Sequence, residues 1–232
     1  MSSLAITWYG HATFVLTSPG GKRIVLDPWL SGNPKAPAGA KIDKADIILV
    51  THGHSDHTTD VVTIARATGA PVVAVYELAG WFGSKGVKDT RGMGIGGTTD
   101  VAGLQISMTP AVHTSSVDDD GKTMYAGLAT GFVIRMEDQR AVYFAGDTAL
   151  FGDMRLIGEQ YAPEIAFLPI GDHYTMDPAA AAKACALLGV RQVVPMHYGT
   201  FPVLTGTPER LKKLVEPLGI DVLVLKPGET AN

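Results

Sequence analysis

The stretch His52-Gly53-His54-Ser55-Asp56-His57 places three of the seven histidines of the chain within six residues, together with one aspartate. It directly follows the apolar run Ile47 to Thr51, which predicts a buried strand. In an extended chain, residues i and i+2 point the same way, so His52 and His54 can bind one metal ion. The stretch therefore predicts a metal site at the end of a strand.

Beyond His54 we expect the chain to turn into a helix, whose start is marked by residues 58–60 (Thr-Thr-Asp). This turn directs Asp56 and His57 toward a neighbouring position, so one loop can supply ligands to two metals. A wholly helical arrangement is less suitable, because ligands on a helix are spaced i and i+4.

Three more candidate ligands follow the ends of predicted strands. These are His113, Asp147 and His197, which come after strands expected over residues 104–108, 141–144 and 192–194. Architectures of the α/β class place their sites at the C-terminal ends of strands. We therefore expect four loops to converge on one edge of the fold.

The chain has 232 residues, of which 46% are hydrophobic and 18% charged, a composition typical of a globular protein with a sizeable core. The Pro-, Gly- and Ala-rich segment 28–40 lies between two predicted strands, so it is interpreted as a surface or active-site loop and not as a linker. The sequence predicts one domain over residues 1–232.

Hairpin strands come first along the chain, strand–helix units follow, and the order then repeats, which favours an α/β fold of two packed sheets with helices outside. One helix is expected between Pro178 and Gly189, with Asp177 as its N-cap, and another from Thr207-Pro208 to near Pro217. Strands are expected over Ala5–Trp8, Thr13–Leu16, Arg23–Leu26, Ile47–Thr51, Val72–Val75, Leu104–Met108, Met124–Met136, Ala141–Phe144, Ile165–Leu168, Gln192–Val194 and Val222–Leu225.

Charge and cysteine content restrict the partners. The net charge is −4 and no run of Lys or Arg exceeds two residues, which argues against nucleic acid and anionic membranes and favours a small-molecule substrate. The single cysteine, Cys185, lies in an apolar run and is expected to be a buried thiol in a reducing compartment. With no signal-peptide pattern and no long apolar stretch, we expect a cytoplasmic location. The sequence indicates no oligomeric state.

Two glycine- or acid-rich stretches have simpler interpretations than a binding site. Residues 92–97 fit G-x-G-x-x-G, but a dinucleotide fingerprint follows a strand and opens a helix, so a glycine-rich turn is expected. Residues 118–121 (Asp-Asp-Asp-Gly) resemble a calcium loop, but Gly127 occupies the position that needs Glu. A hairpin tip or a mobile loop near the site is expected there instead.

The motif at residues 52–57 resembles the His-x-His-x-Asp-His signature of the metallo-β-lactamase superfamily. The resemblance implies a four-layer αββα sandwich. It also implies that Asp147 bridges two metal ions whose other ligands are His52, His54 and His113 for one ion, and Asp56, His57 and His197 for the other.

Residues 8–13 (Trp-Tyr-Gly-His-Ala-Thr), 26–28 (Leu-Asp-Pro) and 171–176 (Gly-Asp-His-Tyr-Thr-Met) look like one branch of this superfamily. That branch contains uncharacterised metal-dependent hydrolases, ascorbate-6-phosphate lactonase and N-acyl-phosphatidylethanolamine phospholipase D. Within these segments His11 and Asp27 are candidates for orienting a ligand or contacting substrate, since metal-bound histidines need a carboxylate partner. His173 is a candidate for facing substrate or donating a proton. Each could instead be an ordinary loop residue.

The resemblance implies a hydrolase in which a metal-bridging hydroxide cleaves an ester, lactone or phosphodiester bond of a small molecule. Five histidines and two aspartates without cysteine suit Zn²⁺ first, although mixed N/O sites also accept Mn²⁺, Fe²⁺ or Ni²⁺. Mn²⁺ is the second choice, because relatives in the ascorbate-lactonase branch are thought to use it. Two alternatives stay open: a di-iron redox protein, which His54 in place of a carboxylate disfavours, and a non-catalytic metal-containing ligand-binding module.

Overall fold

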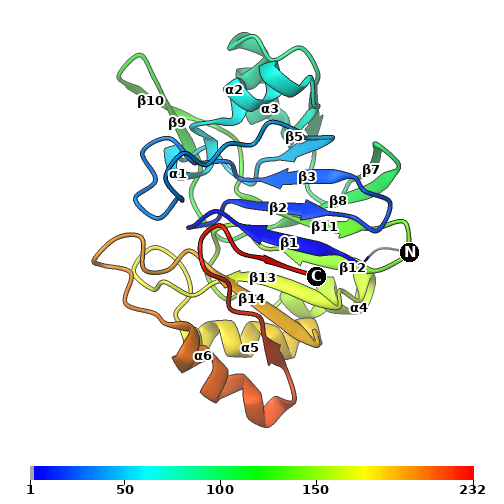
Figure 1. Ribbon diagram of the computed structural model, residues 1–232, viewed down its shortest axis with the longest axis vertical. Coiled ribbons are helices and arrows are strands. Elements are labelled where there is room, and N and C mark those ends of the chain that lie inside the picture. The colour runs from blue at the N-terminus through cyan, green and yellow to red at the C-terminus, as the bar shows by residue number, and fades with distance from the viewer. Residues whose placement is uncertain (1–2) are drawn as a thin grey trace.

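The computed structural model describes residues 3–232 and, within them, contains two seven-stranded sheets packed face to face (Figure 1). The first sheet has the spatial order β16 (Thr230–Ala231), β1 (Ala5–Trp8), β2 (Phe14–Thr17), β3 (Arg23–Leu26), β4 (Ile47–Leu49), β5 (Val72–Val75) and β6 (Thr90–Met93). The second has the order β15 (Asp221–Val222), β14 (Gln192–Met196), β13 (Ile165–Pro169), β12 (Ala141–Phe144), β11 (Thr130–Arg135), β8 (Leu104–Pro110) and β7 (Thr98–Val101).

Helices cover the outer faces of both sheets. The first sheet carries α2 (Val61–Thr68) and α3 (Tyr76–Ser84), with the short helix α1 (Ser55–Thr58) between β4 and α2 in the chain, and the second carries α4 (Met154–Tyr161), α5 (Pro178–Leu188) and α6 (Pro208–Val215), followed by a 3₁₀ turn at Glu216–Leu218. Figure 1 shows α2 and α3 at one end of the molecule and α5 and α6 at the other. The expected four-layer αββα sandwich is confirmed. Within residues 3–232, no helix combines the length and the apolar character needed to cross a membrane.

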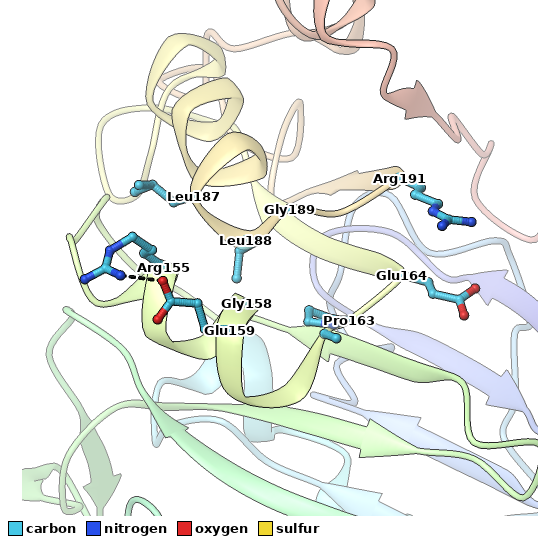
Figure 2. A pocket seen from close by; sticks show the side chains of 10 residues that line it. Arg155, Gly158, Glu159, Pro163, Glu164, Leu187, Leu188, Gly189 and Arg191 are labelled. Atoms are coloured by element: carbon cyan, nitrogen blue, oxygen red, sulfur yellow. Dashed lines mark hydrogen bonds and ion pairs between the residues drawn. The ribbon is translucent and has the colours of Figure 1, made fainter.

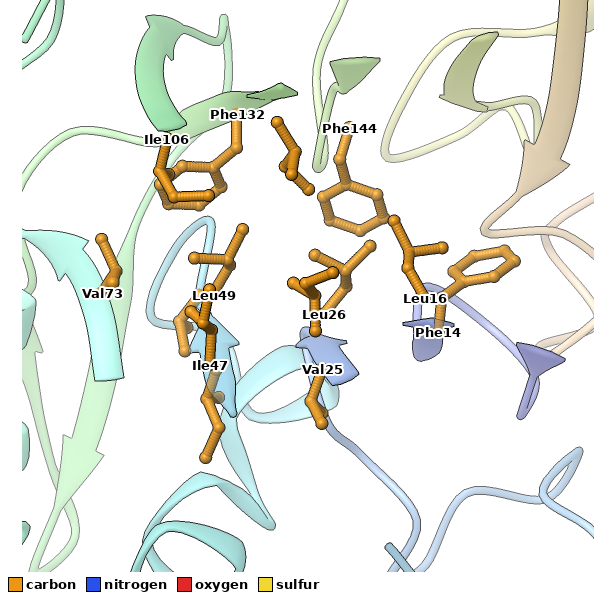
Figure 3. Close-up of a cluster of buried hydrophobic side chains, with 14 of the residues drawn as sticks. Phe14, Leu16, Val25, Leu26, Ile47, Leu49, Val73, Ile106, Phe132 and Phe144 are labelled. Carbon is orange, nitrogen blue, oxygen red and sulfur yellow. The ribbon is translucent and has the colours of Figure 1, made fainter. Parts of the chain in front are cut away.

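Large apolar side chains fill the space between the sheets. Leu16, Leu26 and Leu49 of the first sheet face Phe132 and Phe144 of the second (Figure 3). All five are fully buried, and each contributes roughly 1.5–3 kcal/mol of transfer free energy relative to an exposed side chain. This dense layer fixes the two sheets against each other and so holds the loops at their edges in place.

Strand direction brings the candidate loops to one edge. Strands β3 to β6 run parallel to one another, as do β12 to β15. Strand β8 shares the direction of β12, because both pair antiparallel with β11. The C-terminal ends of β8, β12 and β14 therefore lie on the same edge of the second sheet.

The predicted helix ends are confirmed. The Asp177 carboxylate accepts a hydrogen bond from the backbone of Ala180 at 2.8 Å, and Gly189 ends α5 with a φ of +67°. Thr207 caps α6 in the same way. These caps satisfy backbone groups that a helix end otherwise leaves unpaired.

The prediction of a single strand over Met124–Met136 is wrong. The segment forms the end of β10 (Lys122–Tyr125), a break at residues 126–129, and then β11. Gly127 has a φ of +82°, and a Cβ there would lie 2.7 Å from Val75, so the chain leaves the extended conformation at this glycine. Strand β10 pairs with β9 (Ser116–Asp119), and Asp120-Gly121 forms the expected hairpin tip.

Other boundaries also differ from expectation. Strand β15 ends at Val222, short of the expected Leu225. Helix α1 already begins at Ser55, earlier than expected, and contains two of the candidate ligands. Asp60 precedes α2 as expected, but its carboxylate accepts hydrogen bonds from Leu30 and Ser31 and does not cap the helix. The glycine-rich turn expected over residues 92–97 is confined to residues 94–97, because Gly92 and Met93 end strand β6; the turn leads to β7 in the other sheet.

Candidate metal centre

Four loops bring all seven predicted ligands together around Asp147. One carboxylate oxygen of Asp147, Oδ2, lies 3.0 Å from His197 Nε2, 3.6 Å from His113 Nε2 and 4.0 Å from His52 Nε2. The other, Oδ1, lies 3.4 Å from His57 Nε2. The expectation that the loops converge on one edge is confirmed, with Asp147 in the middle.

The candidate ligand atoms form two groups close to Asp147, and a third, overlapping group consists of Asp27, His52 and His57. His52, His54 and His113 form one group, and His11, Asp56, His57 and His197 form the other, with atoms no more than 4.8 Å apart in each group. In the first group His52 Nε2 lies 3.0 Å from His54 Nδ1. Tetrahedral Zn–N bonds of about 2.0–2.1 Å place neighbouring ligand atoms roughly 3.3 Å apart, so this spacing suits a shared ion.

Two glycines let the ligand-bearing loops approach other backbone closely. A Cβ at Gly53, between two of the histidines, would lie 2.7 Å from the Ser116 carbonyl oxygen and 2.8 Å from Ala126 Cβ. A Cβ at Gly146, which has a φ of +62°, would lie 2.7 Å from Thr51 Cβ. Any side chain at either position would displace the adjacent ligands.

Asp27 is fully buried and orients two of the histidines. Its Oδ2 accepts hydrogen bonds from His57 Nδ1 at 2.8 Å and from the Thr51 hydroxyl at 2.7 Å, and its Oδ1 accepts from the Thr51 amide at 2.8 Å. The Thr51 oxygen in turn accepts from His52 Nδ1 at 3.0 Å. Because Nδ1 of both rings faces these partners, Nε2 is the atom that faces the centre and would bind a metal, as in carboxylate–histidine–metal triads.

His11 is fully buried beside the second group. Its Nδ1 lies 2.9 Å from the Thr200 hydroxyl and its Nε2 lies 3.1 Å from Asp56 Oδ2. Its backbone adopts a φ of +54°, and its carbonyl oxygen accepts hydrogen bonds from the His197 amide and the Trp8 indole. His11 therefore fixes both the carboxylate of Asp56 and the loop that carries His197.

Charge coupling is strong at the centre. Burial alone would raise the pKa of Asp147, but the imidazoles of His197 and His57 hold it well below its usual range. Burial opposes protonation of His57, but the carboxylates of Asp147, Asp27 and Asp56 outweigh it and raise the pKa of His57 well above the usual value. A dense set of buried carboxylates and imidazoles is typical of a cation site.

Some buried atoms at the centre lack a hydrogen-bond partner. These include His57 Nε2 and Asp147 Oδ1, which face each other across 3.4 Å. Buried polar atoms are rarely left unsatisfied, and a divalent ion beside this pair would satisfy both. The residues present therefore fit the metal that the donor set indicates.

A cavity of about 310 Å³ opens onto the centre. It is lined by His54, Asp56, His113, Thr114, Asp147, Tyr174 and His197. Sequence analysis missed Thr114 and Tyr174, since a single loop hydroxyl or aromatic residue has no recognisable spacing. His173, a sequence candidate, is exposed and does not line the cavity; its ring packs edge-on against Tyr174, with centroids 4.4 Å apart.

A larger hollow of about 520 Å³ lies elsewhere, between the ends of α4 and α5 (Figure 2). Its Arg155 is ion-paired with Glu159, and none of its lining residues is a histidine or cysteine. The smaller cavity is therefore the candidate active site, because its lining residues can bind metal.

Comparisons with known proteins agree with this geometry. Residues 22–198 match the family model of the beta-lactamase superfamily domain. The chain is 49% identical to a UPF0173 metal-dependent hydrolase of Solibacter usitatus, over 97% of this chain and 98% of the relative, and 51% identical to one of Rubrobacter xylanophilus, over 97% and 94%. The structure of Igni18, described as a novel metallo hydrolase from Ignicoccus hospitalis, superposes with a TM-score of 0.88 at 40% identity, over 98% of this chain and 97% of that one.

The chain thus belongs to the beta-lactamase superfamily, which confirms the family expected from residues 52–57. Within it, the chain is a metal-dependent hydrolase similar to the UPF0173 proteins over almost its whole length.

Proposed function

We propose that the protein is a binuclear hydrolase in which His52, His54 and His113 hold one ion, Asp56, His57 and His197 hold the other, and Asp147 bridges them. The observation that carries this proposal is that the Asp147 carboxylate lies within 3.0–4.0 Å of histidines from both groups of ligand atoms, with its Oδ1 buried and unpartnered. Structural zinc sites, in contrast, are closed and hold one ion with four ligands.

Bound divalent ions supply a water with a pKa near 7 and stabilise charge on the substrate oxygen. The chain supplies the orientation. Asp27 accepts from Nδ1 of His57 and, through Thr51, orients Nδ1 of His52, so that the Nε2 atoms of both rings point at the centre. His11 holds the Asp56 carboxylate at the second group. We assign His11 and Asp27 as positioning residues.

The proposed substrate is a small molecule with an ester, lactone or phosphodiester bond. The cavity volume of about 310 Å³ lies at the low end of ligand sites. The net charge of −4 does not favour a polyanion such as nucleic acid. For the metal we propose Zn²⁺ first and Mn²⁺ second, because the donor set is five imidazoles and two carboxylates.

The test is elemental analysis of the purified protein by plasma mass spectrometry, paired with a turnover screen of generic phosphodiester, lactone and thioester substrates before and after chelation. We expect about two zinc or manganese ions per chain, and turnover that chelation abolishes and metal restores. Two irons with visible absorbance would instead indicate the redox protein. Bound metal without hydrolysis of any probe would indicate the ligand-binding module.

A further inference from the structure

The loop after β13, residues 171–176, is held rigidly beside the metal centre. Asp172 and His173 both adopt left-handed backbone conformations, with φ of +68° and +57°. The Asp172 amide donates to the Met176 carbonyl at 2.9 Å, and the Met176 amide donates to the Thr148 carbonyl at 3.2 Å. Because Thr148 directly follows the proposed bridging residue, these bonds fix the loop relative to the centre.

Tyr174 projects from this loop and lines the cavity. The residue is 54% exposed, although it belongs to a hydrogen-bonded turn. The His173 ring packs against it edge-on. Within residues 3–232 its hydroxyl makes no hydrogen bond, so the loop backbone and the His173 contact fix the ring, and the hydroxyl does not.

The Tyr174 ring differs in chemical character from the rest of the cavity wall. Five of the seven lining residues belong to the proposed metal ligands and the sixth is Thr114, so Tyr174 supplies the one large apolar surface. Apart from the proposed metal ions, the cavity wall offers no cation to pair with an anionic group, because no Lys or Arg is among these lining residues. A half-exposed aromatic ring gains free energy when an apolar group covers it.

On this basis we propose that Tyr174 determines substrate specificity, by packing its ring against an apolar group next to the carbonyl of an uncharged ester or lactone. This inference rests on the proposed hydrolytic function and narrows its substrate class. Full burial of one methylene corresponds to about a fourfold gain in binding affinity. A ring that covers the methylene from one side supplies about half of that burial. We therefore expect kcat/KM to rise about twofold per methylene.

The experiment compares 4-nitrophenyl acetate, butyrate and hexanoate, which share a leaving group, with bis(4-nitrophenyl) phosphate as the anionic probe. In the wild type we expect about a fourfold rise in kcat/KM from acetate to butyrate, mostly in KM. Tyr174→Ala should lose this rise, whereas Tyr174→Phe should keep it because the ring remains. The matched control is Tyr76→Ala, which removes a tyrosine that is 74% exposed on α3 and does not line the cavity.

Metal content by plasma mass spectrometry and the circular dichroism spectrum accompany each variant, so that a folding or metal defect is recognised. An unchanged chain-length dependence in folded, metal-loaded Tyr174→Ala would overturn the inference. Turnover of the phosphodiester but of none of the esters would overturn it too, while leaving the proposed function intact. No turnover of any probe by the protein with two ions bound would contradict the proposed function itself.

Discussion

Replacement of Asp27 by Asn tests how the fold prepares the metal ligands. Asp27 has a φ of +41°, which Asn tolerates, so the change alters charge and hydrogen bonding more than backbone strain. The amide oxygen can keep the bond from the Thr51 amide, but the NH₂ group then takes the place of Oδ2, which accepts from the Thr51 hydroxyl and His57 Nδ1.

An NH₂ group cannot accept from His57 Nδ1, so in Asp27→Asn the neutral His57 ring would carry its proton on Nε2, the atom that points at Asp147. A protonated Nε2 cannot bind metal until it loses that proton. Loss of such a supporting carboxylate typically costs 10- to 100-fold in metal affinity or activity, which is about 1.4–2.7 kcal/mol. We expect a loss of this size for the ion that His57 would bind.

The assay is competition with a chromophoric chelator, which gives the two dissociation constants, with kcat/KM measured in parallel. Asp60→Asn is the matched control, since this buried carboxylate also accepts hydrogen bonds, but from Leu30 and Ser31. The control should lower the melting temperature and leave both metal affinities within about twofold. Metal affinities in Asp27→Asn equal to those of the wild type would refute the reasoning.

Three further predictions concern other parts of the centre. Asp147→Asn should reduce metal content toward one ion per chain and abolish turnover, measured by plasma mass spectrometry and the generic substrate screen; two retained ions would remove the bridging role. Gly53→Ala should lower metal affinity at least tenfold, because its Cβ would lie 2.7 Å from the Ser116 carbonyl oxygen; wild-type affinity by chelator competition would show that the loop can shift. For His11, burial lowers the pKa from 6.5 to about 4 in the metal-free protein. Between pH 6.5 and 4 the unfolded chain binds more protons at His11 than the folded chain does. This residue therefore lowers the free energy of unfolding by about 2 kcal/mol as the pH falls from 7 to 5. Urea unfolding of the chelated protein should show that His11→Asn loses less free energy of unfolding between pH 7 and 5 than the wild type does. An equal loss in both proteins would contradict the lowered pKa of His11.

The ligand loop could be predicted from sequence because its chemistry and its position share one short segment. The apolar run before His52 indicates a buried strand, and alternation along an extended chain explains why two histidines face the same way. His113, Asp147 and His197 could be placed for the same reason, since each follows a strand whose end lies at the common edge.

The strands that sequence analysis missed are short and depend on their neighbours. Strands β7 (Thr-Thr-Asp-Val) and β9 (Ser-Val-Asp-Asp) are largely polar, and they are extended because they pair with β8 and β10. The break in the segment 124–136 likewise follows from a tertiary contact, the close approach of Gly127 to Val75. The local pattern of residues along the sequence does not indicate such tertiary contacts.

The residues that line the cavity besides the metal ligands could not be predicted from the sequence either. Tyr174 lines the cavity because two left-handed residues turn the chain just before it, and neither Asp172 nor His173 is a residue type that demands this conformation. The sequence made His173 a candidate proton donor, but its ring packs edge-on against Tyr174 and does not line the cavity.

The most direct test of the binuclear centre is anomalous diffraction from crystals of the metal-loaded protein, recorded at the absorption edge of the metal found by elemental analysis. The proposal predicts two peaks about 3.5–4 Å apart. One peak should lie against His52, His54 and His113, the other against Asp56, His57 and His197, with Asp147 between them. A single peak, or two peaks that do not share Asp147, would contradict it.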